Sequence, residues 1–264
     1  MNEYNPVPPQ VPPQIPPSSQ PPIPSYSATV TAPRGLVPLG GKPEDIEPIP
    51  NPFAAVEAIL RQPRCIMYQL RQPGPGPLIG SMVLVALLCA FVYGAVVGTF
   101  SMGVQLWAAP VKIAGGLLVT ALICLPSLYI FTCLSGSQAR LTEICGLVAG
   151  LLMLMTILLV GFAPVAWLFS QSTESATWMG SLHLVFWVVA TYFGLRFLEN
   201  GFSHTQARSA AGLNTWIVIF VLVAVQMTTA LRPIVGTSST FFPAEKKLFW
   251  SYWGDCLEKS QKER

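Results

Sequence analysis

Charged side chains are scarce in this chain, and the few present form no recognisable catalytic or binding motif. Lysine, arginine, aspartate and glutamate make up 10% of the 264 residues, whereas a soluble domain carries about 25%. There are two histidines, and the six cysteines show no Cys-X-X-Cys spacing. The sequence therefore lacks metal-ligand sets, phosphate-binding loops and nucleophile–base pairs. We expect no catalytic residue, cofactor or metal.

Long apolar runs, by contrast, fill most of the segment from Leu78 to Val235, and 52% of the chain is hydrophobic. Five runs have about 20 or more residues each, which is enough to cross about 30 Å of hydrocarbon. They cover residues 78–100, 111–134, 144–169, 178–198 and 213–235. The sequence predicts an all-α membrane protein, with a bundle of about five transmembrane helices over residues 73–236. Pro164 leaves a re-entrant third run as an alternative to a full span.

The basic residues indicate an orientation in the membrane rather than a nucleic-acid partner. The net charge is only +3, and the basic residues are dispersed, so we expect no nucleic-acid binding. No charged stretch followed by an apolar one opens the chain, so we expect no cleavable signal peptide. With the N-terminus in the cytoplasm, six basic residues lie inside and four outside, the orientation that the positive-inside rule favours. The six are Arg61, Arg64, Arg71, Arg140, Arg196 and Arg208; the four are Lys112, Arg232, Lys246 and Lys247. A re-entrant third run would place both termini in the cytoplasm.

Proline dominates the first 50 residues, which contain fifteen of them and few large apolar residues. Such a segment has too little to bury to form a core, and we expect a disordered tether with polyproline-II character over residues 1–50. Pro-X-X-Pro frames such as Pro9–Pro12 and Pro13–Pro16 fit an aromatic groove on a protein partner. No Arg or Lys before Arg34 orients an SH3-type ligand.

Two further segments are predicted to lie at the membrane surface. In residues 51–72, Asn51 is a good N-cap and Pro52 fits the first helical turn, which predicts an interfacial amphipathic helix. Residues 237–264 contain an aromatic and basic stretch from Lys246 to Trp253 and predict a second interfacial segment. Cys65 lies outside the spans and is open to acylation. The apolar face of the first helix comprises Phe53, Val56, Ile59 and Leu60.

Polar residues near the spans lie mostly at span ends. Arg140 and Glu143 are three residues apart, as are Arg196 and Glu199, so each pair can meet on one helix face. His183 lies about one turn into the fourth span, where a packed or hydrogen-bonded histidine is the plainer interpretation and a proton relay the other. Gln226 is deep in the fifth run. Candidate contacts with lipid headgroups or a partner are Arg61, Arg64, Arg140, Glu143 and Arg232.

Small residues recur at helical spacing within two spans. Such stripes let helices approach closely. We predict that they pack the helices of one chain together, with the seam of a homo-oligomer as the alternative. The stripe residues are Ala86, Ala90, Gly94 and Gly98 in the first span, and Gly146 and Gly150 in the third.

The order of these features resembles the Yip1-like family of five-span integral membrane proteins, in its bacterial form. The resemblance is carried by the segment from Asn51 to Arg64, the turn from Leu134 to Leu141 and the pair Ala163-Pro164. It implies a non-enzymatic membrane organiser in the bacterial inner membrane. It supplies no catalytic residue, and neither residues 1–50 nor the aromatic C-terminal segment matches the pattern.

The function that these features favour is a membrane scaffold or assembly factor that docks partners through its flanks. A small transporter or channel is the alternative, although the spans offer few polar residues to line a path. An intramembrane enzyme would need paired carboxylates, a Ser/Lys pair or a histidine cluster at bilayer depth, and the sequence has none.

Overall fold

The computed structural model describes residues 38–101, 103, 105–137, 139–172, 176–204 and 211–230. Within these ranges the chain is all-helical, which confirms the predicted fold class. Five helices are long and apolar enough to cross a membrane, and each overlaps one predicted run. They are α3 (Gly76–Ser101), α4 (Gln105–Leu134), α5 (Leu141–Ser172), α6 (Ala176–Ser203) and α7 (Ala211–Ala230). Of the predicted tether, residues 1–50, only residues 38–50 are described. Its residues 1–37 and the predicted C-terminal segment, residues 237–264, lie outside the described residues.

Two of the long helices continue through internal prolines. α4 begins at Gln105 rather than at residue 111, and so contains both Pro110 and Pro126. α5 is continuous through Pro164, and it has the length of a full span rather than of a re-entrant segment. Neighbouring helices can compensate for the backbone hydrogen bond that a proline removes within a span.

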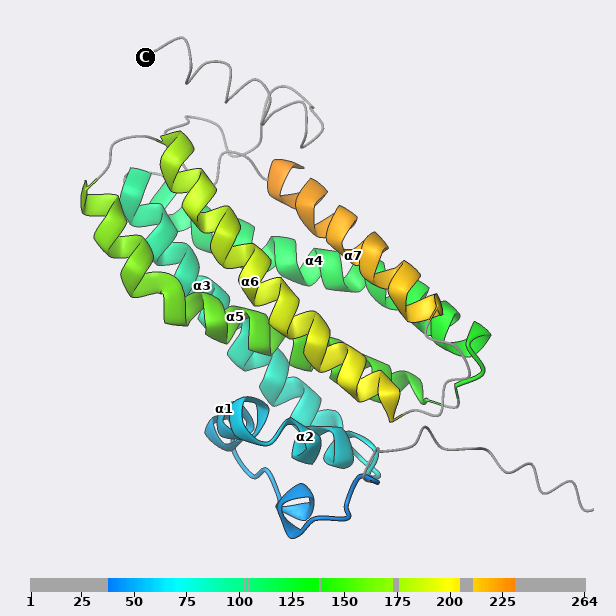
Figure 1. Ribbon diagram of the computed structural model, residues 1–264. Helices are drawn as coiled ribbons and strands as arrows, with labels where there is room; N and C mark the ends of the chain where they lie inside the picture. Colours follow the sequence, from blue (N-terminus) through cyan, green and yellow to red (C-terminus); the bar gives the residue numbers. More distant parts are fainter. Residues whose placement is uncertain are drawn as a thin grey trace, which may run out of the picture. The chain divides into compact units, whose positions relative to one another are not determined.

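α5 is the most enclosed of the five long helices, and α3 and α6 lie beside it (Figure 1). α5 packs against α3 and α6, and α3 also packs against α4. α7 packs chiefly on α4. In an 18-residue apolar stretch of α5, 67% of the residues are buried, whereas in the corresponding stretch of α7 11% are buried. α5 is therefore the core of the bundle, and α7 lies at its edge.

Three shorter helices form a cap at the end of the bundle where α3 and α5 begin (Figure 1). They are the 3-10 helix η1 (Pro43–Ile46), α1 (Pro52–Arg61) and α2 (Pro63–Leu70). Pro63 separates α1 from α2 because its ring ends the first helix and suits the first turn of the next. α1 contacts α3 and α5, and α2 contacts α5 and α6. We call residues 38–71 the cap.

The predicted apolar face of α1 is divided between two environments. Ile59 is buried in the bundle, but Phe53 is 88% exposed and Leu60 51% exposed. The buried face is built instead around Ala55 and Ala58. Alanine allows the backbone of α1 to approach the bundle closely, which turns Phe53 and Leu60 outward.

Candidate functional site

Arg64 on α2 binds the first residues of the cap, Pro38 to Asp45, which follow directly after residues 1–37. Its Nε and Nη2 atoms each donate to a carboxylate oxygen of Asp45, both at 3.2 Å. Nη2 also donates to the carbonyl oxygen of Pro38 at 3.0 Å. Asp45 is 3% exposed, and a buried carboxylate is stable only when paired and hydrogen-bonded. The Arg64–Asp45 pair therefore fixes the path of the chain at Pro38.

A glycine turn completes the surroundings of Asp45. Gly40 has a φ of +83°, a left-handed conformation that glycine adopts without steric cost. This turn directs the Gly40 N–H to Asp45 Oδ2 at 3.2 Å. The hydrogen bond from Arg64 is the main cause that holds the pKa of Asp45 below its ordinary value of 3.8. The carboxylate is therefore ionised at neutral pH.

The carbonyl oxygen of Glu47 is a second anchor for the same segment. The Cys65 thiol donates to it at 3.2 Å, and the side-chain amide of Gln69 donates to it as well. Cys65 is 2% exposed, and burial raises the pKa of its thiol. The thiol is thus protonated and enclosed, which disfavours the acylation that its sequence position allows.

Charged residues also lie where the cap meets the bundle. A cavity of about 10 Å³ separates α2 from α5 and α6, which is room for one water molecule. His204, just after α6, is half-buried there, and burial lowers its pKa, as do the nearby charges of Arg64 and Arg71. The cavity is lined by Met67, Leu70, Arg71, Glu143, Leu147 and Gly201.

The predicted contact residues have separate surroundings rather than one shared site. Arg61 is exposed and pairs with Glu57 at 2.7 Å. Arg140 is exposed and Glu143 faces the cap cavity. Neither Arg140 with Glu143 nor Arg196 with Glu199 forms an ion pair within 4.0 Å, so these two expected pairs do not form. Arg232 lies outside the described residues.

All five predicted packing residues, Ala90, Gly94, Gly98, Gly146 and Gly150, are buried. They meet different neighbours. A methyl group on Gly94 would lie 2.5 Å from Cα of Pro110 on α4, and one on Gly150 would lie 2.5 Å from a Phe197 ring atom on α6. Gly146 receives the Leu70 side chain of the cap. The Gly146–Gly150 frame therefore accommodates side chains of two neighbours and is not a single seam.

At the opposite end of the bundle from the cap, polar side chains are buried between the helices. The Tyr93 hydroxyl of α3 and Nδ1 of His183 on α6 lie 2.7 Å apart, which agrees with a hydrogen-bonded His183. His183 Nε2 has no hydrogen-bond partner within the described part of the chain. Lys112 on α4 is 2% exposed, although its sequence position suggests a residue at the membrane surface.

The sequence gives no signal that pairs Tyr93 with His183, because the two lie on separate spans. Tyr93 lies beside the close crossing of α3 and α4 at Gly94 and Pro110. Tyr93 directly precedes Gly94, and Lys112 follows Pro110 by half a turn. The sequence feature that could have indicated a buried polar group is Tyr93 next to Gly94, a residue of the small-residue stripe.

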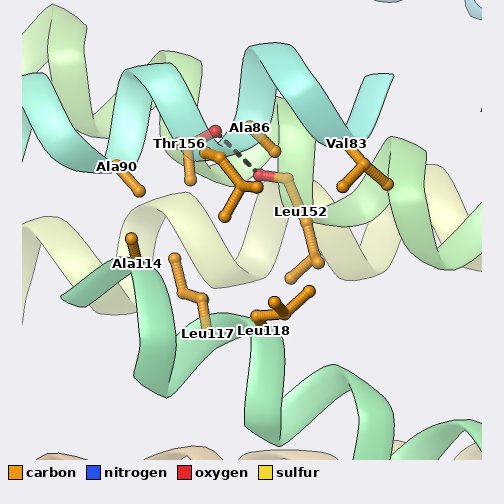
Figure 2. Close-up of a pocket in the computed structure, with 9 residues that line it drawn as sticks. Val83, Ala86, Ala90, Ala114, Leu117, Leu118, Leu152 and Thr156 are labelled. Atoms are coloured by element: carbon orange, nitrogen blue, oxygen red, sulfur yellow. Dashed lines mark hydrogen bonds between the residues drawn. The ribbon is translucent and has the colours of Figure 1, made fainter. Parts of the chain in front are cut away.

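An apolar cavity of about 10 Å³ lies between α3, α4 and α5 (Figure 2). The only hydroxyl in its lining belongs to Thr156, which donates to the carbonyl oxygens of Leu152 and Met153 at 3.0 and 3.1 Å. The cavity thus offers no free polar group to a ligand. Its lining comprises Val83, Ala86, Leu87, Ala90, Ala114, Leu117, Leu118, Leu152 and Thr156.

Within the described ranges, no three His, Cys, Asp or Glu side chains lie close enough together to bind a metal ion. Comparison of the chain with models of protein families, with curated proteins and with solved structures finds no significant match. The described residues include five helices fit to cross a membrane, and the chain is a multi-pass membrane protein by this architecture.

Proposed function

We propose that the protein is a non-enzymatic membrane scaffold or assembly factor that presents its proline-rich segment, residues 1–50, to a protein partner. The observation that carries this proposal is the anchoring of the chain at Pro38 by Arg64. The Arg64–Asp45 pair and the two donors to Glu47 fasten the end of that segment, residues 38–50, to α2. A partner bound to the Pro-X-X-Pro frames would therefore be tethered to the cap through the chain at Pro38.

The interior of the bundle adds support. Buried apolar side chains from all five long helices form one core cluster, and the two cavities described above each hold about 10 Å³. Glycine contacts such as Gly94 with Pro110 bring the backbones close together. A scaffold needs such a rigid core to keep its docking segments in place. The resemblance to the Yip1-like family implies the same kind of role.

We infer that the cap faces the cytoplasm. The start of α3, the start of α5 and the end of α6 lie at the same end because consecutive spans alternate in direction. Among the described residues, this end carries Arg61, Arg64, Arg71, Arg140 and Arg196, whereas Lys112 is at the other end and buried. An excess of arginine marks cytoplasmic loops. In a bacterial inner membrane the proline-rich segment would then meet cytoplasmic partners.

The scaffold proposal can be tested by affinity purification in mild detergent from native membranes. The full chain is compared with a chain that lacks residues 1–37, which keeps the Arg64 contact with Pro38. A second variant replaces Pro9, Pro12, Pro13 and Pro16 with alanine. Stable partners of the full chain that both variants lose would support the proposal. If the full chain retained no partner, or the variants retained all of them, the proposal would be wrong.

Transport is the second candidate, and the buried polar groups favour it. Lys112, Tyr93 and His183 lie within the spans, where polar residues often mark an ion or proton path. The test is proton or ion flux in proteoliposomes that contain the purified chain. A flux that His183→Ala abolishes, and that Trp167→Phe leaves intact, would favour transport over scaffolding.

A further inference from the structure

α7 has two opposite faces with different surroundings. Trp216 and Phe220 are fully buried against the bundle, and the Trp216 indole donates to the Cys124 carbonyl oxygen of α4 at 2.8 Å. On the other face Val218 is 58% exposed and Leu222 57% exposed. Among the described residues, only one side of this span is therefore covered by other parts of the chain.

The uncovered face of α7 also carries amide side chains. Asn214, Val218, Leu222 and Gln226 are all exposed and recur every four residues, which places them on one stripe of a helix. Asn214 lies near the start of α7, and Gln226 lies twelve residues further along, about 18 Å at 1.5 Å per residue. In the part of the chain that is described, the Gln226 amide has no hydrogen-bond partner.

Lipid tails cannot satisfy an amide within the span. Gln226 lies inside the membrane-crossing range Ala211–Thr228. Hydrocarbon offers neither donors nor acceptors, and glutamine amides in membranes commonly bond to a neighbouring helix. The exposed stripe therefore calls for a protein helix that supplies both a donor and an acceptor at the level of Gln226.

We propose that this stripe of α7 is the contact surface of a homodimer, in which Gln226 of one copy pairs with Gln226 of the other. Copies in one membrane share an orientation, so a twofold axis along the membrane normal brings the same level of each α7 together. A carboxamide has both NH₂ donors and a carbonyl acceptor, so two of them satisfy each other. Val218 and Leu222 pack between the Asn214 and Gln226 levels.

The proposal does not depend on the scaffold function, because it concerns copies of one chain and not the proline-rich segment. It also differs from the small-residue stripes: Gly94 and Gly150 are already occupied by Pro110 and Phe197 of the same chain. The homo-oligomer that the sequence leaves open would thus form through α7.

Counting of labelled subunits in liposomes tests the proposal directly. The full chain is reconstituted at decreasing protein-to-lipid ratios, so that only other copies can act as partners. We expect dimers whose dissociation constant rises about eightfold or more in Gln226→Ala, because the substitution removes both amides and therefore both reciprocal interhelical hydrogen bonds. Gln171→Ala removes an exposed amide at the end of α5 and should leave the constant unchanged. A monomeric full chain, or a Gln226→Ala chain that dimerises equally well, would overturn the proposal.

Cross-linking keeps the test independent of any loss of folding in Gln226→Ala. Leu222→Cys should form an intermolecular disulfide in membranes, above the level given by the unsubstituted chain. Val188→Cys is the matched control, because Val188 on α6 is 62% exposed, similar to Leu222. Equal cross-linking at both positions, or none at Leu222, would contradict a contact through α7.

Discussion

The indole N–H of Trp216 donates a hydrogen bond of 2.8 Å to the main-chain carbonyl oxygen of Cys124. The bond is enclosed, since Trp216 is 0% exposed and Cys124 1% exposed. The same oxygen accepts the Ser127 hydroxyl at 2.8 Å, next to Pro126, and Phe220 stacks on the indole with ring centroids 5.1 Å apart. This contact joins the least enclosed span, α7, to α4.

Trp216→Phe should weaken the attachment of α7, because it removes the donor and keeps an aromatic ring. We expect a loss of about 1 kcal/mol in the free energy of unfolding, the typical value for one hydrogen bond. Thermal unfolding of the purified chain in detergent, followed by near-ultraviolet circular dichroism, measures it. Trp167→Phe is the control, because Trp167 is 52% exposed. Equal midpoints for the two variants would contradict the role of the bond.

Gly94→Ala should destabilise the bundle because α3 and α4 cross closely at this residue. The added methyl would lie 2.5 Å from Cα of Pro110, and backbone cannot yield as a flexible side chain can. Overpacking of this kind costs about 1–3 kcal/mol. Gly115→Ala is the matched control, since nothing lies within 4 Å of its added methyl and alanine favours a helix. The same thermal assay should separate the two variants, and a Gly94→Ala midpoint at or above that of Gly115→Ala would refute the close crossing.

Arg64→Ala should release the segment between Pro38 and η1 from the cap. It leaves the buried Asp45 carboxylate with the Gly40 N–H but without its cation, which we expect to cost the cap about 1–3 kcal/mol. Hydrogen–deuterium exchange of the Gly40 and Asp45 amides should accelerate accordingly. Arg61→Ala removes an arginine whose side chain is 75% exposed and should change exchange little, because exposed pairs contribute about 0.5 kcal/mol. Similar exchange in both variants would show that Arg64 does not hold this segment.

The five spans were predictable because hydropathy and length reflect the transfer of each segment into lipid, a local property. Packing between spans was not, because it depends on which helices meet. Gly146 and Gly150 illustrate this difference. Their spacing indicates close approach, but only the structure shows that Gly146 receives Leu70 of the cap and Gly150 receives Phe197 of α6.

Individual polar residues were harder to place than spans. Lys112 follows a predicted loop and suggests a surface residue, yet the start of α4 at Gln105 draws it into the bundle, where it is 2% exposed. The charge pairs proposed for Arg140 and Arg196 also do not form. Three-residue spacing allows contact on one helix, but Glu143 lines the cavity between the cap and the bundle instead. Sequence spacing predicts neighbours on one helix and does not show which surroundings the other helices supply.

Mild acid should loosen the cap end of the bundle through His204. Burial, with the charges of Arg64 and Arg71, lowers the pKa of His204 from its ordinary value of 6.5. In the unfolded chain the imidazole gains its proton near that ordinary pKa, whereas in the folded chain it stays neutral to lower pH. The stability that this difference provides is therefore fully present above pH 6.5 and is lost as the pH falls toward the lower, folded pKa.

Thermal unfolding at pH 7.5 and at pH 5.5 measures this loss, over a range in which ordinary carboxylates with a pKa near 4 stay ionised. The unsubstituted chain should lose stability between the two pH values. His204→Asn keeps a polar side chain of similar size but does not titrate, so its loss should be smaller. The other histidine, His183, is unchanged in both chains and contributes equally to each. Identical losses for the two chains would show that His204 does not govern the acid response, and a larger loss in His204→Asn would reverse its sign.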